Sequence, residues 1–516
     1  MPVGDAVEWK GEPFVLGTAS QLAGARRALE RIGFTEATIC AITGADSIHA
    51  LPARSERETA FVDQASPLSL AVQLFMDGED VAWETVRGVF PADDLSALEC
   101  VGLLQSLPHD PSRCAAYIAL YPLEGLYIAS DRHTRIQLVA SGKPPDLVYS
   151  ALTPETQRFA LLMPRTPCRD YLELCSGTGV AALVAARDFA ERVWAVDITR
   201  RSTRFAAFNA ALNGVENMTA LEGDLYTPVS GQTFDVITAH PPYVPSAETE
   251  MVFRDGGEDG EQITRRILSG LAEHLRPGGR FYCDCVLTER AGAPVEQRIR
   301  EMLGPSKGEF DLLVGQVALI DPDAMLGGAV QSGRLSAAAA AAQRALFHQL
   351  QIEGFVSVGF LIRRRAHAGK ALTRRRFISP RTRAVHLDWY LDFAAAVSDW
   401  EPGSERFLDA RPTVLSHTEL LSRSALRGGR WQATASTLAT DVPFLVQAEC
   451  PTWFATFLTW CDGRATAREL LLRLRNAGIL DGTGTDAQFA VAIGELADRG
   501  FVSLDVLPFP GGAAPS

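Results

Sequence analysis

The stretch Tyr171-Leu-Glu-Leu-Cys-Ser-Gly-Thr-Gly-Val180 decides the fold of this 516-residue chain. Its apolar start predicts a buried strand, and Gly177 and Gly179 let the backbone turn tightly into a helix that starts near Val180. A helix N-terminus offers unpaired N–H groups to a carboxylate or phosphate, so this loop is a candidate ligand cradle.

The segments around this stretch alternate between strand-like and helix-like, which is typical of a doubly wound α/β sheet. The alanine-rich segment Leu335–Gln349 has the high helix propensity expected of a connecting helix. A seven-stranded, Rossmann-like sheet is therefore predicted over residues 151–370. Its expected strands are Asp170–Leu174, Arg192–Asp197, Met218–Glu222, Phe234–Ala239, Arg280–Leu287, Phe310–Ile320 and Val356–Arg363.

Acidic residues stand at the ends of the second and third predicted strands. Asp197 closes Trp194-Ala-Val-Asp197, a position from which a carboxylate can accept hydrogen bonds from ribose hydroxyls. Asp224 closes the next strand, where an acid can accept from the exocyclic amine of adenine. Dinucleotide-binding enzymes share the first feature, but their usual loop has a third glycine where this chain has Ala182.

The fourth predicted strand runs straight into His240-Pro241-Pro242-Tyr243. Two prolines after a buried strand make a stiff turn that fixes its neighbours. An aromatic ring at that turn can stack on a planar substrate group. A glycine-rich run at 256–260 follows, and Pro277-Gly278-Gly279 leads into the fifth strand.

In this order the motifs Glu-Leu-Cys-x-Gly-x-Gly, Asp, Gly-Asp and Pro-Pro-Tyr resemble the class I S-adenosylmethionine (SAM) dependent methyltransferases. They are most similar to the branch that carries an Asn/Asp-Pro-Pro-Tyr/Phe motif. The segment Phe253-Arg-Asp-Gly-Gly-Glu-Asp-Gly260 resembles protein-glutamine methyltransferases that act on release factors and ribosomal proteins. The same branch includes methyltransferases of adenine and guanine exocyclic amines in RNA and DNA.

The resemblance implies a role for each matching residue. SAM is the implied cofactor, and no metal is expected, because the sulfonium is already activated and the protein supplies positioning and proton handling. The residues implied to cradle SAM are Glu173, Cys175, Gly177 and Gly179, with Asp197 on the ribose, Asp224 on the adenine and Leu225 flanking the adenine ring. The residues implied to face the methyl acceptor are His240, Pro241 and Tyr243.

Two of these positions depart from the family pattern. Cys175 replaces the first glycine of the common loop, as it does in some members of this branch. His240 replaces the Asn or Asp that, with a proline carbonyl, hydrogen-bonds an amide or exocyclic amine. A neutral histidine offers one acceptor nitrogen, and it can also take a proton near pH 7, which favours an acceptor that must lose a proton. The alternative is that His240 merely fills the Asn position.

The flanking regions, residues 1–150 and 371–516, are predicted to be mainly helical, winged-helix-like domains. The first has expected helices at Gln21–Arg31, Leu68–Met76, Val81–Val89 and Asp93–Leu104, then a wing of two strands at Ala115–Tyr121 and Gly125–Ser130. Its last helix is acidic, which would repel DNA, so a dimerisation or substrate-covering role is preferred. The second has expected helices at Arg464–Leu474 and Ala487–Arg499 and a strand at Phe501–Leu507.

Composition and targeting patterns bear on location and partners. The net charge of −13 argues weakly against a nucleic-acid partner, because phosphate contacts need clustered Lys and Arg. The nine cysteines form no CxxC pair, which indicates reduced thiols in a cytoplasmic protein rather than a disulfide framework or zinc site. No signal peptide and no membrane-spanning segment are predicted, so no membrane partner is expected.

The predicted function is methyl transfer to a nitrogen or oxygen of a protein side chain or a small-molecule metabolite. One alternative is an RNA or DNA base methyltransferase, for which the basic, loop-like segment Arg363–Arg376 would be the landing strip; otherwise that segment is a solvated linker. Another alternative is a non-catalytic, SAM-binding interaction protein, which the altered His240 motif suggests. A homodimer is compatible with each of these.

Overall fold

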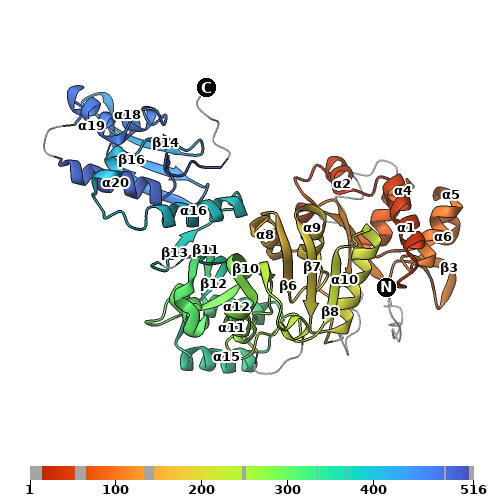
Figure 1. Cartoon of the computed structure of the whole chain (residues 1–516). Coiled ribbons are helices and arrows are strands. Elements are labelled where there is room, and N and C mark those ends of the chain that lie inside the picture. The colour runs from red at the N-terminus through yellow and green to blue at the C-terminus, as the bar shows by residue number, and fades with distance from the viewer. Residues whose placement is uncertain are drawn as a thin grey trace. The chain divides into compact units, whose positions relative to one another are not determined.

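The computed structural model describes residues 14–52, 66–132, 145–246, 251–333, 335–367, 369–451, 453–480 and 484–510 (Figure 1). It contains two compact units. One comprises Met1–Ala160 and Thr166–Val286, and the other comprises Leu161–Arg165 and Leu287–Ser516. Residues 1–13, for which no signal peptide is predicted, lie outside the described residues.

A mixed sheet of eight strands forms the centre of the α/β fold, in the order β13-β11-β12-β10-β9-β6-β7-β8. β6 to β10 are parallel to one another, whereas β11 and β12 are antiparallel to each other. All seven predicted strands are confirmed, but the predicted number was one too few. The strands are β6 (Cys168–Leu174), β7 (Ala190–Asp197), β8 (Met218–Glu222), β9 (Phe234–Ala239), β10 (Leu275–Arg290), β11 (Phe310–Ile320), β12 (Ile352–Arg364) and β13 (Thr373–Phe377).

The eighth strand, β13, contains the arginines that the sequence placed in a basic loop. It pairs with β11 in parallel, and its arginines are held by carboxylates. Arg375 lies 3.1 Å from both Glu289 and Glu296, and Arg376 pairs with Asp498. β13 lacks the apolar alternation by which a strand is usually detected, because its side chains form ion pairs. The same ion pairs neutralise the positive charges that a nucleic-acid landing strip would need.

Helices α9 (Val180–Asp188) and α10 (Arg200–Asn213) pack on the sheet, α9 on β6, β7 and β8 and α10 on β7 and β8. α9 is rich in alanine because it lies close against β6 and β7, where Tyr171, Ala182, Ala185 and Val193 belong to one buried cluster. The N-cap of α10 is Thr199, whose hydroxyl accepts from the Ser202 N–H. The bounds are α8 (Pro154–Leu162), α9 (Val180–Asp188), α10 (Arg200–Asn213), α11 (Gln262–Ser269) and α12 (Leu271–His274), with a short 3₁₀ turn at Thr227–Val229.

The N-terminal part of this unit has a three-stranded antiparallel sheet in the order β1-β3-β2. The elements are α1 (Ala19–Arg31), α2 (Glu36–Thr43), a 3₁₀ turn at Ile48–Ala50, α4 (Pro67–Ala71), a π-helical turn at Val72–Asp77, β1 (Asp80–Ala82), α5 (Trp83–Val89), α6 (Ala92–Cys100), β2 (Gln105–Leu107) and β3 (Asp110–Ala115). The short β1 was predicted as the start of a helix.

The two strands predicted as a wing are confirmed as strands: β4 (Ile118–Leu123) and β5 (Leu126–Asp131) form a hairpin of their own, outside the three-stranded sheet. The hairpin is almost wholly buried, which explains its continuous apolar sequence. It is fixed to α10 by two side-chain amides: Asn209 exchanges hydrogen bonds with the backbone of Ala129, and Asn213 does the same with Tyr127. Burial and hydrogen bonding to α10 are features of this hairpin that the sequence prediction did not include.

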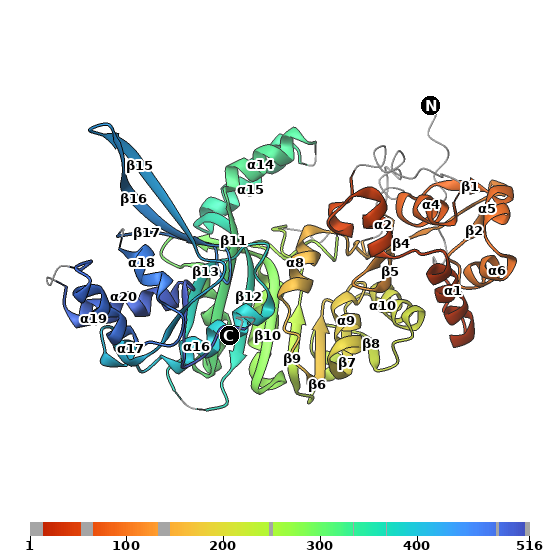
Figure 2. The same ribbon diagram turned by 90° about the horizontal axis from the view of Figure 1, so that it is seen from above.

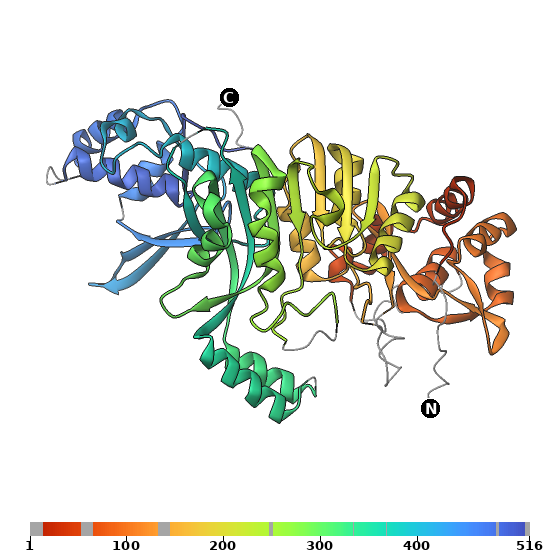
Figure 3. The same ribbon diagram turned by 60° about the horizontal axis from the view of Figure 1, so that its bottom comes forward.

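The second unit carries the remaining helices and a small C-terminal set of strands. α14 and α15 lie side by side as a helical hairpin (Figure 3). The predicted α15, α19, α20 and β18 are confirmed, whereas strands β15 to β17 were not foreseen. The bounds are α13 (Val295–Met302), a 3₁₀ turn at Gly304–Glu309, α14 (Pro322–Gln331), α15 (Ala337–Gln349), α16 (Ala384–Ala396), α17 (Glu405–Asp409), β14 (Pro412–Val414), β15 (Glu419–Arg427), β16 (Arg430–Thr440), β17 (Val446–Cys450), α18 (Phe454–Thr459), α19 (Ala467–Asn476), α20 (Asp486–Asp498) and β18 (Val502–Leu504).

Among the described residues, no helix has the length and apolar character needed to cross a lipid bilayer.

Candidate functional site

The loop between β6 and α9 has left-handed backbone at every second residue. Cys175, Gly177 and Gly179 have φ values of 55°, 52° and 75°. A Cβ at Gly179 would lie 3.0 Å from the Ala206 side chain, whereas a Cβ at Gly177 would meet no atom within 4 Å. Gly179 therefore serves the close packing of α9 on α10, and Gly177 faces open space. Cys175, as a side-chain-bearing residue in this region, stores backbone strain of about 1–2 kcal/mol.

Glu173 lies buried beneath this loop, at the penultimate position of β6. Its Oε2 accepts a hydrogen bond of 2.8 Å from the Ala182 N–H on α9. Burial raises the pKa of Glu173 to about 8, and the nearby Asp197 adds to the effect while N–H groups of α9 oppose it. A buried acid with so raised a pKa is typical of functional sites, because a cationic ligand can compensate its charge.

Asp197 connects the end of β7 to the same loop. Its Oδ2 accepts from the Gly177 N–H at 2.9 Å, and its Oδ1 accepts from the Thr199 N–H at 3.0 Å. Burial raises the pKa of Asp197, which these two hydrogen bonds partly offset. Two predicted residues, Gly177 and Asp197, are thus in direct contact, although they are distant in sequence.

One polar atom of the loop has no hydrogen-bond partner among the described residues. The Ser176 Oγ is buried and unsatisfied, next to the open space at Gly177. A buried hydroxyl without a partner costs free energy unless a ligand or water satisfies it. The carboxyl groups of Glu173 and Asp197, this hydroxyl and the open space fit a ligand that carries both positive charge and hydroxyl groups, as SAM does.

Asp224 and Leu225 follow β8 at the same edge of the sheet. The Asp224 carboxylate pairs with Arg266 of α11 at 2.6 Å, in a half-exposed position. Leu225 has a φ of 49°, so the backbone is strained here as it is at Cys175. Two of the four side-chain-bearing residues with positive φ in the described chain therefore flank this edge. Arg266 was not foreseen as a partner of Asp224.

The His240 ring lies among aromatic rings at the end of β9. Its centroid is 5.5 Å from the Phe159 ring and 6.2 Å from the Tyr243 ring, which it meets nearly parallel. Burial, reinforced by the positive charge of Arg158, lowers the pKa of His240 to about 4. So low a pKa speaks against the expectation that His240 takes a proton near pH 7, and a neutral imidazole offers one acceptor nitrogen.

A buried ion pair beside His240 was missed by sequence reasoning. Arg158 on α8 donates two hydrogen bonds of 2.7 Å to Asp284 on β10. The Asp284 side chain is fully buried, and burial raises its pKa to about 6 although Arg158 opposes the rise. A lone acid inside the apolar strand Phe281–Leu287 was the available signal, since a buried charge requires a partner.

The glycine-rich loop at residues 256–260 packs on the His-Pro-Pro-Tyr turn at residues 240–243. Val244 donates to the Arg254 carbonyl and accepts from the Gly256 N–H, both at 2.9 Å. A Cβ at Gly256 would lie 2.8 Å from the Pro242 carbonyl oxygen, and a Cβ at Gly260 would collide with the Tyr243 carbonyl oxygen. These two glycines are thus required by close backbone approach. The structure brings the His-Pro-Pro-Tyr turn and the glycine-rich loop into one assembly.

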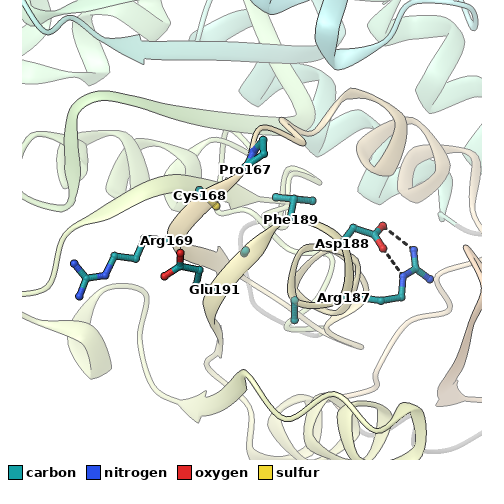
Figure 4. Close-up of a pocket in the computed structure, with 9 residues that line it drawn as sticks. Pro167, Cys168, Arg169, Arg187, Asp188, Phe189 and Glu191 are labelled. Carbon is teal, nitrogen blue, oxygen red and sulfur yellow. Dashed lines mark hydrogen bonds and ion pairs between the residues drawn. The ribbon is translucent and has the colours of Figure 1, made fainter.

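A hollow of about 580 Å³ lies elsewhere in this unit (Figure 4). It is lined by Pro167, Cys168, Arg169 and residues 186–191, and the neighbouring Arg187 and Asp188 form an ion pair of 2.6 Å there. These residues lie at the amino ends of β6 and β7. The predicted cofactor residues follow the carboxyl ends of the same strands, so this hollow is separate from the candidate site.

Comparison with known proteins identifies the same segment. The family described as the methyltransferase small domain matches residues 150–306. The ribosomal protein uL3 glutamine methyltransferase of Bradyrhizobium diazoefficiens is 38% identical over 126 residues, which are 22% of this chain and 39% of that protein. The release factor glutamine methyltransferase of Gloeobacter violaceus is 35% identical over 121 residues, which are 21% of this chain and 42% of that protein.

The chain therefore spans about two fifths of the length of these two relatives. The matched segment contains the loop after β6, Asp197, the His240 turn and the 256–260 loop. Residues 150–306, which match the methyltransferase small domain, form a class I methyltransferase domain that resembles the protein-glutamine methyltransferases.

Proposed function

We propose that this chain is a SAM-dependent methyltransferase that methylates the side-chain amide nitrogen of glutamine in a protein. The observation that carries the proposal is the packing of the 256–260 loop on the His-Pro-Pro-Tyr turn. Each motif alone occurs in several methyltransferase types, but their combination resembles the relatives that act on glutamine.

The residues proposed to hold SAM surround the carboxyl ends of β6, β7 and β8. SAM would supply an activated methyl group on a sulfonium. The Glu173 and Asp197 carboxyl groups would face its positive charge and its ribose hydroxyls, and the Ser176 hydroxyl would gain a partner. Asp224 would accept from the adenine amine while still paired with Arg266, because a carboxylate has capacity for several donors. The remaining proposed cofactor residues are Cys175, Gly177, Gly179 and Leu225.

The residues proposed to hold the acceptor are His240, Pro241 and Tyr243. A neutral imidazole can accept one amide N–H, and the Pro241 carbonyl can accept the other, which orients the nitrogen lone pair. Transfer forms a carbon–nitrogen bond, breaks the carbon–sulfur bond and releases one amide proton to water. The protein's contribution is orientation rather than base catalysis, since His240 has too low a pKa to compete for protons near neutral pH.

The altered motif therefore supports the amide acceptor over a hydroxyl or ammonium acceptor. A hydroxyl or ammonium group must lose its proton before it can attack, and the low pKa of His240 makes that residue a poor base for taking it. The base-methyltransferase alternative is also weakened, because the arginines of its proposed landing strip other than Arg365 are paired with carboxylates. The experiment that tests methyl transfer also tests the alternative of a non-catalytic, SAM-binding protein.

The experiment incubates the purified protein with methyl-labelled SAM and extract of the source cells, which is then separated into protein, RNA, DNA and small-molecule fractions. The proposal expects label in the protein fraction and, by mass spectrometry, on a glutamine side chain. The matched control is the His240→Ala variant, which should bind SAM and transfer little label. Label only in nucleic acid or in a metabolite would refute the proposal, and SAM binding without any transfer would favour the non-catalytic alternative.

The finer architecture is also a proposal. Helix α4, β1, α5, α6, β2 and β3, with the strand order β1-β3-β2, support a winged helix over residues 67–115. Its Asp94 is buried and paired with Arg31 at 2.7 Å, which supports a packing role for this face. We retain the division into 1–150, 151–370 and 371–516, a winged-helix-like C-terminal domain, a homodimer and a cytoplasmic location as predictions.

A further inference from the structure

A long two-stranded ribbon in the second unit has no role in the proposed reaction. β15 and β16 run antiparallel and form the thin arm seen in Figure 2. They are joined by Gly428 and Gly429, whose φ values of 55° and 76° suit the tight turn that best matches the twist of a hairpin. From Glu419 to Gln432 the residues are exposed, apart from the half-buried Ala425. Both faces of the arm's outer half are thus open to solvent.

The two faces of the arm differ in chemistry. Successive side chains of a strand point to opposite faces, so Arg423 and Arg427 share one face of β15. The cross-strand partner of Arg427 is Arg430, which joins them on that face. The other face presents Leu426 and its partner Trp431, which are 60% and 73% exposed. The arm therefore has a cationic face and an aromatic face at its tip.

The three arginines of the arm form no ion pair with any described residue. Several other arginines of this unit are paired with carboxylates, as Arg406 is with Asp399 at 2.7 Å and Arg468 with Asp409 at 3.0 Å. Like charges directly opposite each other across two strands destabilise a hairpin. The Trp431 ring pairs across the strands with Leu426 but leaves most of its surface in solvent. An arrangement that costs stability in the free protein points to an anionic partner that also offers a surface for stacking.

We propose that this arm, residues 419–440, binds single-stranded RNA, with phosphates on the arginine face and a base stacked on Trp431. Arg423 and Arg427 are about 13 Å apart along the strand, so they reach different phosphates of one chain. Bases of any sequence stack on an aromatic ring, and arginine pairs with phosphate. Because the ribbon is only two strands wide, a flexible single strand can contact both of its faces.

A second copy of the chain is a poorer occupant. The tip exposes one leucine and one tryptophan, whereas a stable protein–protein interface buries about 800 Å² on each partner. Charge-driven binding of a phosphate backbone needs no such apolar area. The proposal goes beyond the methyltransferase assignment and does not depend on it, since binding to the arm requires neither SAM nor an acceptor.

The test measures fluorescence anisotropy of a labelled, unstructured RNA of about 12 nucleotides with the full chain, without SAM. Three phosphate contacts predict a slope of log affinity against log salt of about −2 between roughly 50 and 200 mM salt. The Arg427→Ser/Arg430→Ser variant should bind about tenfold more weakly, with a slope reduced by about 1.4. Trp431→Ala should also weaken binding about tenfold.

The matched control is Arg406→Ser/Arg468→Ser, which removes one exposed and one half-buried arginine, both paired with carboxylates, from the same unit and should leave RNA binding nearly unchanged. Circular dichroism of each variant confirms that it is folded. Absence of RNA binding at low salt, or equal losses in the arm and control variants, overturns the proposal. Binding only to phosphatidylglycerol vesicles, or a dimer in light scattering that the arm variant abolishes, overturns it in favour of a membrane or a second copy.

Discussion

Arg158 on α8 holds both carboxylate oxygens of Asp284 on β10, with Nε–Oδ2 and Nη2–Oδ1 distances of 2.7 Å. The next residue of α8, Phe159, lies against both the His240 ring and the Tyr282 ring. One ion pair therefore fixes α8 beside the proposed acceptor turn. The same guanidinium also helps to keep His240 neutral, because a positive neighbour disfavours protonation of the imidazole.

Replacing Arg158 by Met should destabilise the protein by about 3–5 kcal/mol, because it leaves the buried Asp284 carboxylate unpaired. The double variant Arg158→Met/Asp284→Leu should recover most of this loss, since it removes both charges. Urea unfolding measures both effects. The control is Arg192→Met. Its partner Asp170 still pairs with Arg276 at 2.6 Å, so this variant should lose much less stability. Equal losses in the single and double variants would contradict the pairing argument.

Replacing Asp197 by Ala should weaken SAM binding at least about tenfold, through loss of contacts to the ribose and release of the Gly177 backbone. Asp197→Asn should lose less, because the amide oxygen can still accept from Gly177. Isothermal titration calorimetry gives both affinities. Asp224→Ala is the comparison variant, and its effect should be smaller, since Asp224 is half exposed and already shares its charge with Arg266. SAM affinity that is unchanged in Asp197→Ala would remove Asp197 from the cofactor site.

The strands that the sequence located well are those with local signals. β8, β9 and β11 have the predicted bounds, because each is an apolar run closed by glycine, proline or an acid. The loop after β6 and Asp197 were likewise recognisable, since each follows the end of such a strand. Their direct contact through the Gly177 N–H follows from the parallel pairing of β6 and β7.

The features that were missed depend on distant or exposed residues. β13 and the ribbon β15–β16 lack apolar alternation, so nothing local separates them from loops. Arg158 and Asp284 are far apart in the chain, and their contact exists only once α8 packs on the sheet. The low pKa of His240 likewise arises from burial, and the residues next to His240 in the chain do not reveal that burial.

Replacing Gly260 by Ala should displace the 256–260 loop from the proline turn, because the new Cβ would collide with the Tyr243 carbonyl oxygen. Methyl transfer should fall at least about tenfold, since small misplacement of reacting groups costs rate, while SAM affinity should change little. Gly278→Ala is the matched control: its φ is also positive, at 82°, but its Cβ would meet no atom within 4 Å. Equal effects in the two variants would mean that backbone strain alone is responsible.

The state of His240 can be tested by its effect on stability across pH. The folded protein holds the pKa of His240 at about 4, below its usual 6.5, so the unfolded chain binds the proton first as pH falls. The stability that His240 contributes is fully present above pH 6.5 and is lost as pH falls from 6.5 towards 4, by up to about 3 kcal/mol. Urea unfolding at several pH values should show a shallower loss in His240→Asn, which has no ionisable group there.

The protonation state of His240 also predicts the pH dependence of turnover. If the neutral imidazole is the acceptor of the amide N–H, turnover of the wild type should show no ionisation near pH 6.5, and His240→Asn should keep more activity than His240→Ala. A pH limb near 6.5 that disappears in His240→Asn would instead identify His240 as a base, and the amide acceptor would then lose its support.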